Sequence, residues 1–164
     1  CMHETGLLRQ LSLPRHADLP GGAKVFLREK PGRTGDIQGE LAEIDGQGVA
    51  HVLCLLTENE LNTSSSYRDA LKGGHLSAKF HHCPLQTSCR IEDKPRLIGH
   101  LRDIAAALHS GESVLIHCES GQVRTGCAAA LLLTLFGVDL DDALATVRMA
   151  GSDPEAFDPV PMLH

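Results

Sequence analysis

The chain has 164 residues and a formal net charge of −6, with 42% hydrophobic residues, 3% aromatic residues and no tryptophan. This length predicts one domain, and the composition predicts a globular core of aliphatic side chains. A nucleic-acid partner is disfavoured, because such a surface needs positive charge and stacking rings.

Membrane and disulfide features are missing from the sequence pattern. No segment approaches a membrane span, and residues 6–11 are too short and too interrupted for a signal peptide. The six cysteines lack the paired spacing of a metal site, and a chain of this size does not need a disulfide framework. We therefore expect a cytoplasmic protein without a membrane partner.

Hydrophobic periodicity and Gly/Pro punctuation predict strands and helices that alternate along the chain. The first half is expected to hold a strand at 23–27, a helix at 36–46, a buried strand at 49–56, a loop at 57–61, a short polar helix at 64–71 and a strand at 77–85.

The second half continues this alternation. It is expected to hold a long amphipathic helix at 93–110 with Pro95 in its first turn, a buried strand at 114–116, an apolar helix at 127–136 and a final helix at 139–150 capped by Asp139. The proline-rich tail after residue 150 is expected to be irregular. This order predicts a single α/β domain, in which helices cover both faces of a mainly parallel sheet.

One passage predicts a chemistry. The apolar run ending at Ile116 delivers His117 and Cys118 into a glycine-containing loop that closes on Arg124 and Thr125 before a helix. Loop amides and a helix N-terminus favour an oxyanion, and the same field favours the reactive thiolate of Cys118. Arg124 has a planar fork for two further oxygens, and the Thr125 hydroxyl is placed to donate to the sulfur.

The pattern His117-Cys118-x-x-Gly121-x-x-Arg124-Thr125 resembles the signature of the cysteine-dependent protein tyrosine phosphatase superfamily. Within it, the chain is most similar to small dual-specificity enzymes related to the kinase-associated phosphatases. The resemblance covers about residues 13–150 and implies one phosphatase domain over 1–164, with an irregular tail at 151–164. It implies hydrolysis of phosphomonoesters through a phosphocysteine, without cofactor or metal. The implied phosphate-binding residues are Glu119, Ser120, Gly121, Gln122, Val123 and Arg124.

The general acid departs from the family pattern. The family places an aspartate just after the equivalent of Pro84-Leu85, where this chain has Gln86-Thr87-Ser88, none of which is an acid near neutral pH. The candidates left open are Asp93, Glu119 or no protein acid at all. Asp93 also suits the first turn of a helix, and Glu119 is expected to point away from the phosphate that it would repel.

The sequence also suggests roles for several other residues. Cys54 is either a core cysteine or a partner for a protective disulfide with Cys118, as in some superfamily members. His117 is expected to brace the loop, and Gly126 to allow close packing of helix and sheet. His81 and His82 fall on opposite faces of a strand, which disfavours a metal site.

Three functions remain open from the sequence. The first is a tyrosine or dual-specificity phosphatase, the second a phosphate-binding module with weak turnover, and the third another thiolate enzyme such as a sulfurtransferase or arsenate reductase. Retained Arg124 and Thr125 favour the first over the third. Residues 119–123 carry no lysine or arginine, which disfavours polyphosphorylated lipids and favours a phosphorylated protein, above all phosphotyrosine. The oligomeric state is not predicted.

Overall fold

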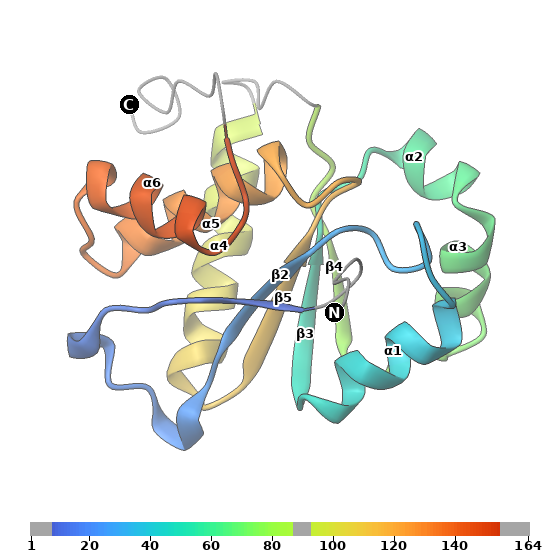
Figure 1. The fold of residues 1–164 in the computed structure, drawn as a ribbon, viewed down its shortest axis with the longest axis horizontal. Coiled ribbons are helices and arrows are strands. Elements are labelled where there is room, and N and C mark those ends of the chain that lie inside the picture. Colours follow the sequence, from blue (N-terminus) through green and yellow to red (C-terminus); the bar gives the residue numbers. More distant parts are fainter. Residues whose placement is uncertain (1–7, 87–92, 155–164) are drawn as a thin grey trace.

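A computed structural model describes residues 8–86 and 93–154 and contains one five-stranded sheet (Figure 1). The sheet order is β1 (Arg9–Leu11), β2 (Val25–Arg28), β5 (Ser113–His117), β3 (Val49–Cys54) and β4 (Lys79–His82). All neighbouring strands are parallel except β1, which pairs antiparallel with β2. The expected mainly parallel α/β fold is confirmed.

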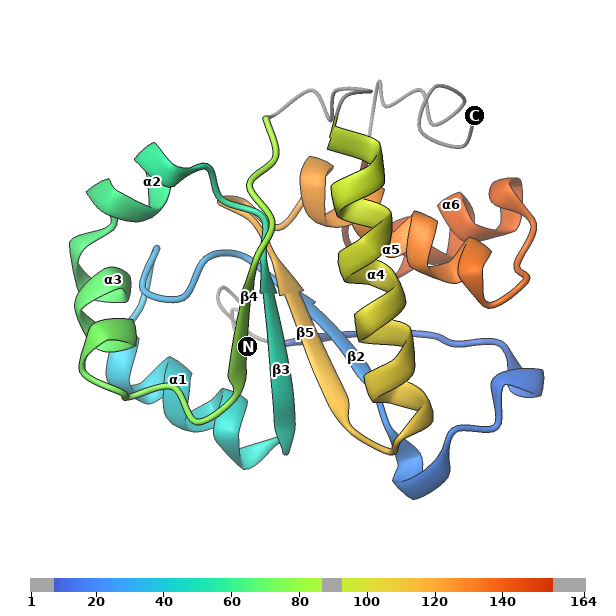
Figure 2. The same cartoon turned by 180° about the vertical axis from the view of Figure 1, so that it is seen from behind.

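Helices cover both faces of this sheet (Figures 1 and 2). One face carries α4 (Lys94–His109), α5 (Val123–Leu135) and α6 (Leu140–Met149), and the other carries α1 (Ile37–Gly46) and α3 (Ser65–Lys72). Each face has its own hydrophobic cluster. None of the helices among the described residues is long and apolar enough to cross a bilayer.

The long periodic helices begin and end close to where the sequence predicts. Pro95 lies in the first turn of α4, where its missing N–H costs nothing, and Gly111 follows the helix with φ +88°. The Asp36 side chain caps α1 by accepting from the Gly39 amide at 3.1 Å. Asp139 is the N-cap residue of α6 as expected, although its side chain makes no capping hydrogen bond.

Two expectations about local structure were wrong, and one strand was missed. Residues 57–61 do not form a loop, because Thr57 caps the short helix α2 (Glu58–Thr63). The apolar helix expected at 127–136 begins four residues earlier, at Val123, so the end of the signature lies in its first turn. The strand β1 was not anticipated, since three residues are too few for a periodic pattern.

The carboxyl ends of β3, β4 and β5 lie together at one edge of the sheet. The Leu55 amide donates to the His117 carbonyl at 3.0 Å, and the Leu85 amide donates to the Leu55 carbonyl at 3.2 Å. The three segments that follow these strands are therefore neighbours. Ligands of open α/β sheets bind at this kind of edge.

Candidate active site

Two carbonyl oxygens of the loop after β5 bind groups outside the loop. The Glu119 carbonyl accepts from the Lys30 amide at 3.1 Å, and the Gly121 carbonyl accepts from two side chains outside the loop. Within the described parts of the chain, the backbone amides of residues 119–122 donate to no protein acceptor. Successive unpaired N–H groups before a helix N-terminus are suited to binding an anion, and we refer to this loop as the cage.

Gly121 is required by both conformation and space. Its φ is +72°, and a Cβ at this position would lie 2.7 Å from the backbone carbon and oxygen of Arg28. Gly126 also permits a close approach, but a Cβ there would meet the Pro154 ring at 3.0 Å. The expectation that Gly126 packs against the sheet was therefore wrong: its neighbour is the segment after α6.

Cys118 lies at the base of the loop and is 1% exposed. The hydroxyl of Thr125, itself fully buried in the first turn of α5, donates to the Cys118 sulfur at 3.0 Å. This is the contact that the sequence predicts. A donor aimed at the sulfur stabilises a thiolate more than a thiol.

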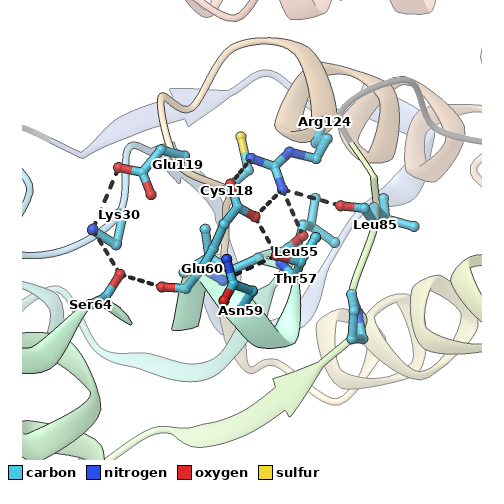
Figure 3. A network of polar contacts seen from close by, with 12 residues as sticks. Lys30, Leu55, Thr57, Asn59, Glu60, Ser64, Leu85, Cys118, Glu119 and Arg124 are labelled. Atoms are coloured by element: carbon cyan, nitrogen blue, oxygen red, sulfur yellow. Dashed lines mark hydrogen bonds and ion pairs between the residues drawn. The ribbon is translucent and has the colours of Figure 1, made fainter. Parts of the chain in front are cut away.

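Arg124 is clamped by a carboxylate that the sequence analysis did not select. Its guanidinium donates to both oxygens of Glu60, at 2.7 and 3.0 Å, and to the carbonyls of Leu55 at 3.3 Å and Leu85 at 3.1 Å (Figure 3). Hydrogen bonding from Arg124 lowers the pKa of Glu60 from 4.5 to about 2. Bidentate pairing of this kind fixes the plane and direction of a guanidinium.

The capping box of α2 orients the Glu60 carboxylate. Glu60 accepts from the Thr57 amide at 2.8 Å, and the Thr57 hydroxyl accepts from the Glu60 amide at 3.1 Å. The Thr-x-x-Glu pattern predicts this helix start. The contact between Glu60 and Arg124 cannot be predicted from a local pattern, because these two residues lie 64 positions apart.

We expect Glu60→Gln to destabilise the fold in a pH-dependent way. Because folding depresses the pKa of Glu60, its contribution is complete above about pH 4.5 and is lost as the pH falls toward 2. A shift of this size corresponds to about 2 to 3 kcal/mol at neutral pH after allowance for partial exposure.

The measurement is urea unfolding of wild type and Glu60→Gln at pH 7 and pH 3. The difference in unfolding free energy should shrink to about half or less at pH 3. Glu43→Gln on α1 serves as a control and should show little difference at either pH, because the partly buried Glu43 carboxylate makes no hydrogen bond or ion pair within the described chain. A Glu60→Gln difference that stays constant between the two pH values would contradict the ion-pair account.

Glu119 points away from the cage, as expected. Its carboxylate pairs with Lys30 at 3.4 Å, and the Lys30 ammonium also donates to the Ser64 hydroxyl at 2.9 Å (Figure 3). The Glu119 carboxylate also lies 3.7 Å from Arg33. These ion pairs compensate the charge of the two cations beside the loop. They also hold the Glu119 carboxylate in a position set by the segment after β2.

Asp93 lies at the start of α4, close to the segment that follows β4. It pairs with Arg96 at 3.0 Å, and Arg96 also donates to the Pro84 carbonyl at 2.7 Å. The next carbonyl, that of Leu85, binds Arg124. The Asp93 side chain makes no capping hydrogen bond, and its buried Oδ2 accepts none within the described chain. Gln86 is exposed, while Thr87 and Ser88 lie outside the described residues.

His117 supports the loop from the opposite face of the sheet. Its Nδ1 lies 3.0 Å from the Cys118 carbonyl and its Nε2 lies 2.8 Å from the Tyr67 hydroxyl. Burial lowers the pKa of His117 to about 4, so the ring is neutral near pH 7. Since a carbonyl only accepts, Nδ1 carries the proton and the Tyr67 hydroxyl donates to Nε2.

Cys54 and Cys118 are both free thiols on different sides of the sheet. Cys54 packs in the cluster under α1 and α3, whereas Cys118 packs in the cluster under α4 and α5. Burial raises the pKa of Cys54 to about 12, which disfavours its thiolate. Both thiols are free here, so the protective disulfide stays a prediction.

The histidines of β4 are divided between the two faces, as predicted. His81 lies 3.0 Å from His51, and His82 lies 2.7 Å from the Leu56 carbonyl. Among residues 8–86 and 93–154, no three potential ligands of the His, Cys, Asp or Glu type are placed to hold a metal.

Comparison with known families agrees with this geometry. A family model described as "Swiss Army Knife protein, DSP-PTPase phosphatase domain", PTP-SAK, matches residues 26–158, most of the chain. The chain belongs to the PTP-SAK family. This membership confirms the dual-specificity type of the cysteine-dependent phosphatase superfamily that the signature predicts, and with it a phosphatase function. Among curated proteins, none matches the chain.

Solved structures share the PTP-SAK fold. Kinase-associated phosphatase with its catalytic cysteine changed to serine has a TM-score of 0.75 at 17% identity, covering 98% of this chain and 92% of that one. Tk-PTP in its active form has a TM-score of 0.59 at 25% identity, and the match covers 85% of this chain and 86% of Tk-PTP. TpbA from P. aeruginosa, in complex with phosphotyrosine, has a TM-score of 0.60 at 16% identity, and the match covers 94% of this chain and 86% of TpbA.

Proposed function

We propose that this PTP-SAK domain hydrolyses phosphotyrosine in proteins through a phosphocysteine formed on Cys118. The observation that carries the proposal is the 3.0 Å hydrogen bond from the Thr125 hydroxyl to the Cys118 sulfur at the base of a loop whose amides are unpaired within the described chain. The hydrogen bond stabilises the thiolate form of Cys118, which is the nucleophile, and the loop amides next to it can bind a tetrahedral anion.

In the first step, the Cys118 thiolate attacks phosphorus opposite the ester oxygen. The S–P bond forms while the P–O bond breaks, and the leaving oxygen departs with its electron pair. Loop amides and Arg124 hold the equatorial oxygens as charge moves onto them. Glu60 keeps the guanidinium of Arg124 in one plane during this step.

In the second step, water attacks the phosphocysteine. A P–O bond forms, the S–P bond breaks, and inorganic phosphate leaves while the thiolate is regenerated. The Thr125 hydroxyl stabilises the sulfur as it departs. Neither step uses a metal or a redox change.

The charge around the loop supports a substrate with a single phosphate. Residues 119–123 contribute no cation, and Lys30 and Arg33 beside them are already paired with Glu119. A polyphosphorylated headgroup would find little uncompensated positive charge. The phosphotyrosine complex of TpbA is consistent with the same substrate class. Because the nucleophile is a thiolate, we propose a reducing compartment, the cytoplasm, as the site of action.

The direct test is hydrolysis of a chromogenic aryl phosphate, with vanadate as a competitor. Turnover that saturates and is inhibited competitively by vanadate supports the proposal. Tight vanadate binding without turnover would support a phosphate-binding module instead. No vanadate binding at all would contradict the proposed cage.

The dependence of the rate on the leaving group tests for a general acid. We propose Asp93 as the general acid, since it lies near the Leu85 segment that binds Arg124. Wild-type rates should then vary little with leaving-group pKa, and Asp93→Asn should lose about a hundredfold or more on alkyl esters and little on activated aryl esters. The measurement is kcat/KM across a series of aryl and alkyl phosphates.

Asp103→Asn, an exposed aspartate farther along α4, is the matched control and should leave the series unchanged. A steep dependence in wild type that Asp93→Asn does not alter would show that Asp93 is not the acid. In that case Thr87→Asp should restore part of the rate on poor leaving groups, because it places a carboxyl where the family has its own.

A further inference from the structure

The catalytic loop is tied to both ends of the described chain. The Gly121 carbonyl accepts from the Ser152 hydroxyl at 2.6 Å and from Arg9 Nη2 at 3.0 Å. Arg9 Nη1 in turn donates to the Ser152 oxygen at 3.0 Å and to the Ala150 carbonyl at 2.8 Å. Arg9, Ser152 and Gly121 therefore form a closed triangle of hydrogen bonds.

The neighbouring peptide is anchored by a second pair of contacts. The Gln122 side chain donates to the Gly151 carbonyl at 3.0 Å and accepts from the Asp153 amide at 3.1 Å. The segment after α6 thus lies along the outside of the loop and reaches the first turn of α5, where Pro154 meets Gly126 (Figure 1).

This arrangement fixes the direction of one loop amide. In a trans peptide the carbonyl and the following N–H point in opposite directions. Two donors that hold the Gly121 carbonyl outward therefore direct the Gln122 amide to the opposite side, toward the interior of the loop. Because glycine adopts left-handed and right-handed φ values with similar ease, the Gly121–Gln122 peptide could rotate more readily in the absence of such contacts.

Burial and charge give the triangle its strength. Ser152 is fully buried, so its hydroxyl has no competing water, and Arg9 is half-buried. Burial lowers the pKa of the Arg9 guanidinium, and nearby Cys118 acts in the opposite direction. Arg9 lies outside the residues matched by the family model.

We propose that Arg9 and Ser152 are positioning residues that hold the Gly121–Gln122 peptide so that the Gln122 amide faces the bound phosphate. The proposal rests on the proposed function only in that the loop binds a phosphate-like anion. Neither residue contacts the reacting atoms, and each acts through the Gly121 carbonyl.

The test compares vanadate affinity, measured by isothermal titration calorimetry, with kcat and KM on an aryl phosphate. Ser152→Ala and Arg9→Met should each weaken vanadate binding by about fivefold to tenfold, as expected for one lost hydrogen bond. The double variant should lose about a hundredfold, because no donor then remains on the Gly121 carbonyl. Arg9→Lys, which keeps the charge and one donor nitrogen in place of two, should recover part of the loss.

Arg148→Gln is the matched control. It removes an ion pair of 3.2 Å to Asp153 in the same segment without touching the loop, and should leave vanadate affinity within about twofold. Vanadate binding within twofold of wild type in the double variant would overturn the proposal, even if its melting temperature falls. If vanadate binding depends on Arg9 and Ser152 but the protein shows no turnover, the proposed hydrolase activity is wrong and the positioning role of Arg9 and Ser152 still holds.

Discussion

Cys118→Ser is expected to abolish hydrolysis while leaving phosphate binding largely intact. A serine hydroxyl is not ionised near neutral pH, so the attacking group is lost, whereas the loop amides and Arg124 remain. Turnover should fall by about ten-thousandfold or more, by analogy with the removal of nucleophiles elsewhere. The measurement is the steady-state rate on an aryl phosphate together with calorimetric binding of inorganic phosphate.

Cys54→Ala provides the control for this substitution. It removes another buried thiol but leaves the nucleophile, so turnover should stay within about threefold of wild type. Residual turnover near wild type in Cys118→Ser would rule out the phosphocysteine. Loss of phosphate binding in Cys118→Ser would instead show that the sulfur helps to build the cage.

Arg124→Lys should lose about a hundred- to thousandfold in kcat/KM although the charge is kept. An ammonium cannot span two equatorial oxygens, nor can it pair with both oxygens of Glu60 as the guanidinium does. Removal of one well-placed transition-state donor typically costs about 2.7 to 4 kcal/mol. The measurement is kcat/KM on an aryl phosphate, with circular dichroism to establish that the variant is folded.

Arg102→Lys, at an exposed position on α4, is the matched control and should leave kcat/KM unchanged. Activity of Arg124→Lys within about threefold of wild type would mean that bidentate clamping is not the role of the arginine. Glu60→Gln should give a smaller loss, because an amide still offers one acceptor to Arg124.

Local sequence signals predict the parts of the fold that are long or locally determined. The helix α4 has its apolar stripe, its proline and its terminal glycine within one segment, so its ends were predicted to within a residue or so. The capped helix α2 was missed because six residues carry too little periodicity, although its capping box was present.

The residues of the candidate site also fall into two groups, those that a local sequence pattern predicts and those that only the fold brings together. Cys118, Arg124 and Thr125 lie within eight consecutive residues, and the 3.0 Å contact between threonine and sulfur follows from that spacing. Glu60, Arg9 and Ser152 reach the loop from other elements, 64, 112 and 31 positions from their partners. Only the fold brings these residues to the loop, so no local pattern reveals them.

Direct detection of the phosphocysteine tests the central proposal most sharply. Wild-type protein is mixed with an activated aryl phosphate, quenched in acid during turnover and digested, and the peptide that carries Cys118 is examined by mass spectrometry. We expect one added phosphoryl group on Cys118, which forms as fast as the phenol is released and is absent from Cys118→Ser. Steady turnover with Cys118 unmodified at every quench time, or with the phosphoryl group on another residue, would contradict the mechanism.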